Sequence, residues 1–257
     1  MKIYVLVKEV PDTYGERALD LETGLAVRDG DTVLDEICER ALEAALNIAE
    51  QHEGTEVVAL SMASEAATAS VRKALAIGAD SAVHIVDERL AGADLGLTAE
   101  TLVAAIRRGA PDLVLAGNVS TDGAGGMIPA MLAEHLSVVH ATSLSSVEVE
   151  EGRVSGMRVT EDGAQTLSAQ LPAVVSITDA LPEARFPNFK SIMAAKKKPV
   201  EVLSLEDLGV SVDASAVPYA VMTSVSQKPP RKAGVKLVDE GDAVSQLVEF
   251  LEQNRLV

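Results

Sequence analysis

Short apolar runs alternate with longer amphipathic stretches along much of the chain. Five runs rich in Val, Ile, Leu and Ala have the length of buried strands, at 2–10, 55–62, 81–87, 111–117 and 172–178. Apolar positions recur at helical spacing between and after the first four runs, over 34–54, 64–80, 98–109 and 127–136. Strands that are apolar on both faces and alternate with helices predict an α/β fold with a doubly wound, mostly parallel sheet.

The ends of two helices carry recognisable boundary signals. Asp35 is placed to cap the start of the helix over 34–54, and Gly54 ends it. Ser64 is placed to cap the start of the helix over 64–80, and Gly78 lies at its end. The stretch 29–35 before the first helix has turn chemistry rather than a strand pattern.

The pattern changes after about residue 140. Apolar and polar residues alternate over 143–171, with turn dipeptides at Glu151-Gly152 and Asp162-Gly163, which predicts two added antiparallel hairpins. The stretch 226–241 is punctuated by Pro and Gly, and an amphipathic helix follows over 242–254. The end of the chain is therefore expected to be an extended C-terminal arm.

Charge and composition exclude several classes of function. A formal net charge of −17 disfavours binding to nucleic acid or to an anionic membrane, since both are negatively charged. One cysteine precludes an intramolecular disulfide and indicates a reducing compartment. The N-terminus lacks a signal-peptide cleavage pattern, and no apolar window approaches the length of a membrane span, so we expect a cytoplasmic protein.

The segment Gly117–Ile128, here called the glycine loop, follows a predicted strand and opens a predicted helix. Its glycines allow backbone N–H groups to approach an anion, and the helix N-terminus adds partial positive charge, so a nucleotide phosphate fits it. The loop matches neither a Walker motif nor G-x-G-x-x-G and contains no lysine. A long turn that merely caps the helix explains the local sequence equally well.

Residue types associated with catalysis are scattered. The four histidines lack metal-ligand spacing, and His84 lies within a predicted strand, where a satisfied core histidine is the simpler interpretation. Cys38 lies on the apolar stripe of its helix, which favours a small buried hydrophobe over a nucleophile. We identify no G-x-S-x-G motif and no carboxylate pair placed for acid–base chemistry. We therefore predict no catalytic residue and no metal site.

Residues 184–199, here called the aromatic–lysine segment, differ from the rest of the chain. Phe186 and Phe189 are two of only three Phe in the protein, and they stand close to Lys196, Lys197 and Lys198. Pro187 favours an extended start, and a short helix with the lysines at its C-terminus is expected to follow. Large apolar groups here, including Ile192 and Met193, indicate contact with a partner protein. The alternative is that they pin the segment to the core.

The segment also carries a family resemblance. The stretch "LPAVVSITDALPEARFPNFKSIMAAKKKPVEVLSLEDLGV" (171–210) closely resembles the signature region of electron transfer flavoprotein β subunits. The resemblance extends through "VKEVPD" (7–12), "CERALEAAL" (38–46), "VRKALAIGAD" (71–80), "DLVLAGNVSTDGAGG" (112–126) and "RKAGVKL" (231–237). It therefore covers nearly the whole chain.

The resemblance implies a heterodimer with an α subunit, which supplies most contacts to a redox-active FAD, while the β subunit holds a structural AMP. By matching positions, it implies AMP contacts at the first strand's end, the first helix's start, the second strand's end and the glycine loop. These residues are Leu6, Asp35, Glu36, Ile37, Cys38, Met62, Gly117, Asn118, Val119, Ser120, Thr121, Asp122, Gly123, Ala124, Gly125, Gly126, Met127 and Ile128.

Some positions depart from the family pattern. Many members have Asn-Pro-Phe at Asp35-Glu36-Ile37, Lys at Asn118 and a second Asp at Ala124. The first change adds negative charge beside an anionic ligand unless Asp35 caps its helix. An aromatic residue near the flavin ring in some members matches Tyr14 here better than Thr13.

The resemblance also implies a role and a domain organisation. Residues 1–183 would form the nucleotide-binding domain, 184–199 the partner-recognition loop, and 200–257 a closing segment and arm on the α subunit. The heterodimer would carry single electrons from acyl-CoA and other flavin dehydrogenases, as in fatty acid oxidation, to an electron transfer flavoprotein–quinone oxidoreductase. Phe186, Phe189, Ile192, Met193, Lys196, Lys197 and Lys198 would contact the dehydrogenases.

Two alternatives stay open. An electron-bifurcating β subunit would hold a second FAD in the AMP pocket and use NADH as donor. A regulatory domain that binds an adenine nucleotide would act without an α subunit.

Overall fold

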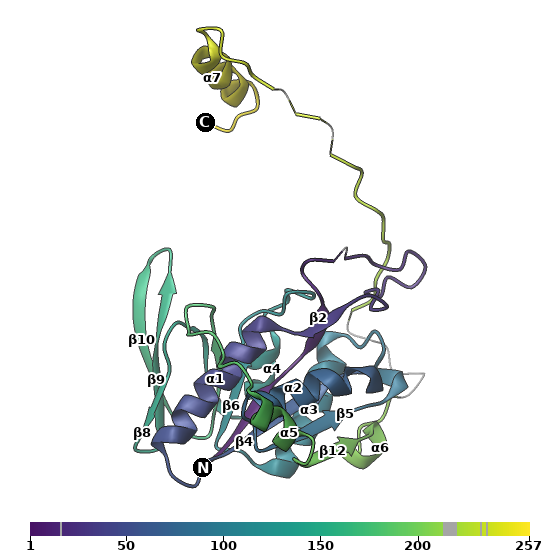
Figure 1. Ribbon diagram of the computed structural model, residues 1–257, viewed down its shortest axis with the longest axis vertical. Coiled ribbons are helices and arrows are strands. Elements are labelled where there is room, and N and C mark those ends of the chain that lie inside the picture. The colour runs from purple at the N-terminus through teal and green to yellow at the C-terminus, as the bar shows by residue number, and fades with distance from the viewer. Residues whose placement is uncertain (16, 213–219, 232, 235) are drawn as a thin grey trace. The chain divides into compact units, whose positions relative to one another are not determined.

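The computed structural model describes residues 1–15, 17–212, 220–231, 233–234 and 236–257, which fall into two units, Met1–Thr223 and Ser224–Val257 (Figure 1). Seven parallel strands form the central sheet of the first unit, in the order β12-β5-β4-β1-β6-β11-β7. Their bounds are β1 Lys2–Leu6, β4 Glu56–Met62, β5 Ser81–Ile85, β6 Leu113–Gly117, β7 Val139–Leu144, β11 Ala173–Ile177 and β12 Val200–Leu203. The predicted α/β fold with a doubly wound sheet is confirmed.

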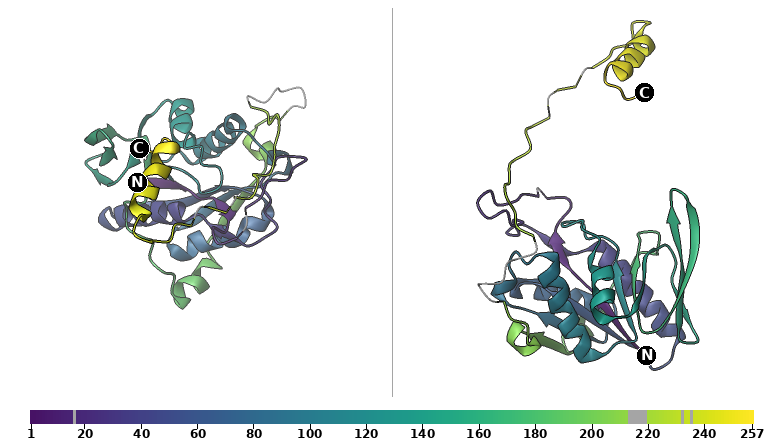
Figure 2. Two further views of the ribbon diagram at one scale, coloured as in Figure 1. Left: turned by 90° about the horizontal axis from the view of Figure 1, so that it is seen from above. Right: turned by 180° about the vertical axis from the view of Figure 1, so that it is seen from behind.

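Helices cover both faces of this sheet, as Figures 1 and 2 show. One face carries α1 (Glu36–Gln51) and α2 (Thr68–Ile77), and the other carries α3 (Leu95–Gly109) and α4 (Ile128–Leu136). Successive residues of a strand point to opposite faces, so Ile3 and Val5 of β1 pack under α1 whereas Tyr4 packs with α3. Burial on both faces explains why the central strands are continuous apolar runs.

The strand order reverses direction beside β1. From β1 the chain proceeds through α1 to β4 and through α2 to β5 on one side, and then through α3 to β6 on the other side of β1. In open sheets of this kind the loops after the two strands at the reversal diverge and leave a crevice at their carboxyl ends. The ends of β1 and β6 therefore define the expected ligand edge.

Several strand predictions need correction. The run 2–10 is two strands, because after Leu6 the chain leaves the sheet and β2 (Glu9–Pro11) pairs antiparallel with β3 (Thr32–Leu34). Part of the stretch interpreted as a turn is thus a strand. The edge strands β7 and β12 were not predicted, because edge positions are half exposed and their sequences lack an apolar run. The remaining elements include η1 (Glu65–Ala67), η2 (Glu88–Leu90) and α6 (Leu205–Leu208).

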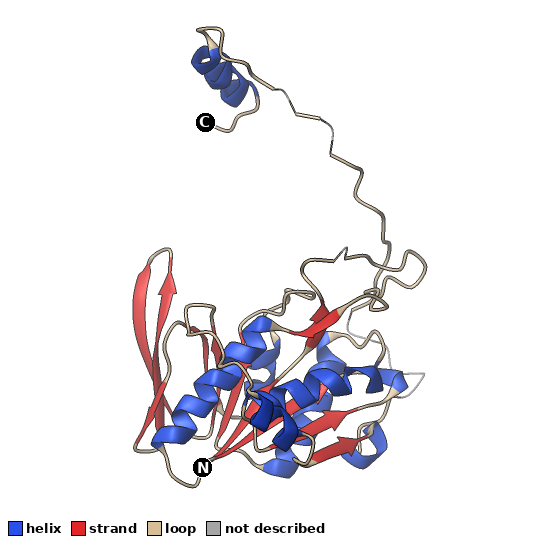
Figure 3. Cartoon of the chain, viewed as in Figure 1, coloured by secondary structure: helices blue, strands red, loops and turns tan. Residues whose placement is uncertain are grey.

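A separate antiparallel sheet contains β8 (Glu148–Glu150), β9 (Arg153–Thr160) and β10 (Gly163–Gln170), and Figure 3 shows these strands in red. The two predicted hairpins are confirmed. Glu151 and Gly152 both have positive φ, 47° and 75°, as a two-residue hairpin turn requires. The second turn lies at Glu161-Asp162, one residue earlier than predicted, because Gly163 already pairs with Thr160.

The second unit contains α7 (Ala243–Gln253), within the helix predicted at 242–254. Its large apolar side chains are exposed in the single chain, including Val244, Leu247, Val248 and Phe250. The domain boundaries expected from the resemblance stay predictions, and residues 213–219, 232 and 235 of the predicted closing segment lie outside the described residues.

Candidate functional site

The residues implied in nucleotide binding lie where the topology places the ligand edge. Leu6, Met62 and Gly117 are the last residues of the neighbouring strands β1, β4 and β6, and Asp35 immediately precedes α1. Gly117 is packed so closely against Ile37 that an added Cβ would lie 2.6 Å from its side chain. This contact brings the start of the glycine loop against the first turn of α1.

The glycine loop is held by an ion network centred on Asp122. Its carboxylate binds Lys8 Nζ at 2.7 Å and Arg28 Nη2 at 2.6 Å, and its side chain is only 8% exposed. Arg17 also donates a hydrogen bond to the carbonyl oxygen of Thr121. Burial alone would raise the pKa of Asp122, but the hydrogen bonds and charges of Lys8 and Arg28 outweigh it and hold the pKa well below the ordinary aspartate value.

Asp35 serves the glycine loop rather than the helix that it precedes. Its side chain makes no capping hydrogen bond to α1, which corrects the sequence-based expectation. Instead Oδ2 accepts a hydrogen bond from Thr121 N at 2.9 Å, and the residue is 1% exposed. Oδ1 has no hydrogen-bond partner among the described residues. The loop is therefore fixed on one side by Asp35 and on the other by Lys8 and Arg28.

The far end of the glycine loop exposes backbone donors. Gly125, Gly126 and Met127 are exposed, and within the described residues their backbone N–H groups make no hydrogen bond. They precede α4, whose N-terminal N–H groups have no intrahelical acceptor. Gly126 has a φ of 64°, a conformation that favours glycine. Because Lys8 and Arg28 already neutralise Asp122, this end of the loop suits an anionic group.

Replacing Asp122 by Asn tests the ion network that Asp122 forms with Lys8 and Arg28. We expect the unfolding free energy to fall by about 1–2 kcal/mol, because two cations lose their shared carboxylate. The stabilisation from a depressed aspartate pKa is fully present above the unfolded value, roughly 3.9, and is lost only as pH falls below it. Urea unfolding should therefore give the same deficit at pH 5 and pH 8. Asp29→Asn, at an exposed neighbour, should change little; an equal loss there would contradict the assignment.

Two other predictions concern the core. Cys38 is 6% exposed, and burial together with the Asp35 charge raises the pKa of its thiol to about 12. The interpretation of Cys38 as a small buried apolar residue is therefore confirmed. His84 is buried in β5 as predicted, but its Nε2 has no hydrogen-bond partner among the described residues, so the expectation of a satisfied histidine is only partly met. Burial lowers the pKa of His84.

The aromatic–lysine segment presents its large apolar groups to solvent. Phe186 is 93% exposed and Phe189 79% exposed, and Ile192 and Met193 are each 44% exposed. Asn188 caps the helix α5 (Phe189–Ala195) by accepting a hydrogen bond from Ser191 N at 2.9 Å. The predicted short helix with lysines at its end is confirmed. The alternative in which both Phe pin the segment to the core is contradicted by their exposure.

Arg185 fastens the start of this segment to α1. Its guanidinium binds both carboxylate oxygens of Glu43 at 2.9 Å and also Glu50 at 2.5 Å, and its backbone N donates to Glu43 at 3.0 Å. Glu43 is buried, which alone would raise its pKa, but Arg185 outweighs burial and lowers the pKa below the ordinary glutamate value. The bidentate pair therefore fixes the point at which the exposed aromatics begin.

The end of the segment is fastened to α2. Arg72 Nη1 donates to the carbonyl oxygens of Ala195 and Lys198 at 2.9 and 2.8 Å. Lys198 Nζ in turn donates to the carbonyl oxygens of Leu75, in the last turn of α2, and of Gly78 and Ala79, which follow the helix. Burial lowers the pKa of Lys198. Lys198 thus has a structural role that the sequence did not indicate, whereas Lys196 and Lys197 remain exposed.

Some predicted site residues lie apart from these contacts. Tyr14 is 99% exposed, and its backbone N–H donates a hydrogen bond to Asp12 Oδ1 at 3.0 Å. Among the described residues its side chain makes no hydrogen bond. The anchors Lys8, Arg28, Arg72 and Arg185 were not predicted. Lys8, Arg72 and Arg185 stand inside the stretches that carry the family resemblance, and that was the only signal available for them.

Comparison with known proteins identifies the family. Residues 23–208 match the model of the electron transfer flavoprotein domain. The chain is 45% identical to electron transfer flavoprotein subunit beta of Mycobacterium leprae over 264 residues, covering 99% of both chains. The chain belongs to the electron transfer flavoprotein β-subunit family. The Bacillus subtilis β subunit is 32% identical, with 98% of this chain and 96% of that one covered.

One relative has a more specific name. The caffeyl-CoA reductase-Etf complex subunit CarD of Acetobacterium woodii is 32% identical, with both chains fully covered.

Membership in the electron transfer flavoprotein family gives the coarse function. It implies electron transport associated with a flavin, an α subunit as partner, and dehydrogenases as reaction partners. Among the described residues, no cluster of His, Cys, Asp and Glu could hold a metal ion. In the same part of the chain, every helix is too short or too polar to cross a membrane.

Proposed function

We propose that this chain is the β subunit of a cytoplasmic electron transfer flavoprotein heterodimer. Its FAD, held mainly by the α subunit, would pass single electrons from acyl-CoA and other dehydrogenases to a membrane-bound quinone oxidoreductase. The observation that carries this proposal is the match to β subunits over 99% of the chain, combined with two exposed Phe on a rigidly held segment.

The ligand edge supports AMP as the nucleotide of this subunit. Gly125, Gly126 and Met127 offer a phosphate three N–H groups that make no hydrogen bond among the described residues, and the Asp122 carboxylate is neutralised by two cations. Leu6 and Met62 are half-buried apolar side chains at the same edge and suit the face of an adenine ring. The residues present therefore fit an adenylate, although Asp35 replaces a neutral residue frequent in the family.

The chain itself would supply binding and positioning without bond-making catalysis. FAD, when bound, would supply the redox chemistry, and the β subunit would complete its site at the subunit interface. Tyr14 is the candidate of this chain for contact with the flavin, since its side chain is fully available. The exposed apolar face of α7 would pack on the α subunit as part of the C-terminal arm.

The aromatic–lysine segment would be the docking site for dehydrogenases. A handful of buried aromatic anchors commonly dominates an interface, and preorganisation reduces the entropy lost on binding. Arg185, Arg72 and Lys198 hold the two ends of the segment, so Phe189 is presented on a fixed helix. Lys196 and Lys197 give this docking surface a positive charge that attracts an acidic partner despite the protein's negative charge.

One alternative has support from a relative. The chain is 32% identical to a subunit of a caffeyl-CoA reductase-Etf complex, and this supports an electron-bifurcating role as the alternative. In that role a second FAD would occupy the ligand edge in place of AMP, and NADH would be the electron donor. Co-expression with the α subunit followed by gel filtration and visible spectroscopy tests the shared part of both versions. A yellow heterodimer is expected; a colourless monomer that acts alone would contradict both.

A further inference from the structure

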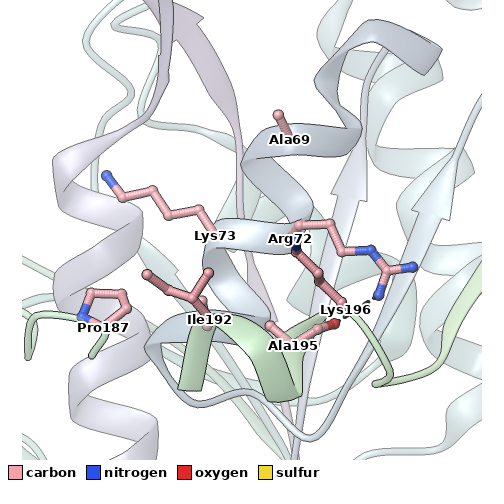
Figure 4. Close-up of a pocket in the computed structure, with 8 residues that line it drawn as sticks. Ala69, Arg72, Lys73, Pro187, Ile192, Ala195 and Lys196 are labelled. Carbon is pink, nitrogen blue, oxygen red and sulfur yellow. Dashed lines mark hydrogen bonds between the residues drawn. The ribbon is translucent and has the colours of Figure 1, made fainter. Parts of the chain in front are cut away.

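A groove lies between α2 and the aromatic–lysine segment (Figure 4). Its volume is about 550 Å³, and α2 and the segment each contribute four lining residues. In Figure 4, Arg72 extends from α2 toward Ala195 and Lys196, whereas Lys73 extends from α2 in the opposite direction. The full lining is Ala69, Arg72, Lys73, Ala76, Pro187, Ile192, Ala195 and Lys196.

The walls of this groove combine an apolar surface with a cationic rim. Ala76 and Ala195 are buried and form part of an apolar base, while Lys73 and Lys196 are exposed. Lys73 also pairs with Glu39, and Arg72 is held in place by the carbonyls of the segment. Among the described residues that line the groove, the charged ones are Arg72, Lys73 and Lys196, which are all cations, in a chain whose net charge is −17.

The groove is continuous with the proposed docking surface. Ile192 both lines the groove and belongs to the exposed apolar group with Phe189 and Met193. A partner surface that covers Phe189 would therefore also cover the groove. An acidic partner surface that binds next to the lysines would therefore face the apolar base of the groove and the cations around it.

We infer that docking is reciprocal: while Phe189 projects outward, the groove receives an apolar side chain of the dehydrogenase that has a carboxylate beside it. This inference rests on the proposed function and adds the chemistry of the partner's contribution. The apolar side chain would contact Ala76, Ile192 and Ala195, and the neighbouring carboxylate would pair with Lys196, because Lys73 already pairs with Glu39. A second copy of this docking surface is disfavoured as occupant because its own segment is cationic.

Filling the groove tests the inference. Ala69 is exposed on α2 and lines the groove, whereas Ala66 is exposed in η1 and does not. In the assembled heterodimer with a purified acyl-CoA dehydrogenase, Ala69→Leu should raise the KM for the heterodimer about tenfold with kcat retained, because the added side chain occupies the partner's space. Ala66→Leu should leave the KM unchanged. Equal KM values for the two variants would overturn the inference.

Two lysine variants of equal charge change distinguish a specific contact in the groove from long-range electrostatic attraction between the proteins. Lys196→Glu and Lys197→Glu change the net charge equally, but only Lys196 lines the groove. We expect a clearly larger KM increase for Lys196→Glu that persists at high salt, where long-range attraction is screened. Equal increases that vanish with salt would overturn the reciprocal contact.

The outcomes also distinguish this inference from the proposed function. If Phe189→Ala raises the KM while Ala69→Leu does not, docking stands and the groove inference fails. If neither changes the KM with any dehydrogenase tested, the docking function itself fails. Loss of heterodimer assembly in Ala69→Leu would assign the groove to the α subunit or to this chain's own arm, and would also overturn the inference.

Discussion

Phe189→Ala in the assembled heterodimer is expected to lower kcat/KM for dehydrogenase-dependent flavin reduction roughly 30-fold, which corresponds to about 2 kcal/mol. The side chain is 79% exposed, so its contribution to the fold of the single chain is small. Its loss would remove an anchor that becomes buried only in the complex. Flavin content and melting temperature should therefore stay at their wild-type values. Stopped-flow reduction at varied heterodimer concentration measures the effect.

Val159→Ala provides the matched control for Phe189→Ala. Val159 is also exposed, at 60%, but lies on β9 in the separate antiparallel sheet. Its kinetics should match the wild type, because no docking role is assigned to that sheet. An unchanged kcat/KM for Phe189→Ala with every dehydrogenase tested would refute the anchor. A fall in the melting temperature instead would mean that Phe189 supports the fold.

Arg185→Ala is expected to affect both stability and docking. Glu43 is buried and would lose its bidentate partner, so the unfolding free energy should fall by about 2 kcal/mol after allowance for the exposed part of Arg185. The start of the aromatic–lysine segment would also lose its attachment to α1, so the KM for the heterodimer should rise while kcat is retained. Urea unfolding and steady-state kinetics measure the two effects.

The pH dependence of the stability lost in Arg185→Ala tests whether the unpaired, buried Glu43 carboxylate causes that loss. In the wild type the lowered pKa of Glu43 gives a stabilisation that is fully present above the unfolded glutamate pKa, about 4.3, and is lost as pH falls through the lower folded value. In the variant, burial without Arg185 should raise the Glu43 pKa above the unfolded value. Protonation then favours the folded state, so the deficit should shrink between pH 7 and pH 5.

Two further variants control for Arg185→Ala. Glu50→Gln removes only the more exposed partner of Arg185 and should cost less than about 1 kcal/mol. Glu43→Gln in the Arg185→Ala background removes the buried charge and should abolish the difference between pH 7 and pH 5. A deficit in Arg185→Ala that grows as pH falls would contradict the role assigned to Glu43.

The fold was largely predictable because the central strands are buried on both faces. Runs such as 111–117 and 172–178 are apolar for this reason and could be recognised without a structure. The edge strands could not, since Val139 and Val202 are exposed and alternate with polar residues that also suit a loop. The short β2–β3 pair depends on contacts across 20 residues of intervening chain, which local patterns do not encode.

The place of the glycine loop at the end of a central strand was predictable, but the contacts that hold the loop were not. A glycine-rich stretch after a strand indicated the ligand edge, and the strand reversal beside β1 supplies the physical reason for its place. Asp35 looked like a helix cap because its sequence position suits one, yet tertiary contact with Thr121 takes its carboxylate. Lys198 looked like a surface cation, whereas the carbonyls after α2 bind its ammonium. Such roles depend on long-range packing.

The cofactor inventory of the purified heterodimer tests the central claim most directly. Native mass spectrometry, with chromatography of the extracted ligands, should find one FAD and one AMP for each pair of α and β subunits. Two flavins without AMP would contradict the structural-adenylate account and favour the electron-bifurcating alternative. The absence of any flavin from the assembly would contradict the assignment of this chain to an electron-carrying heterodimer.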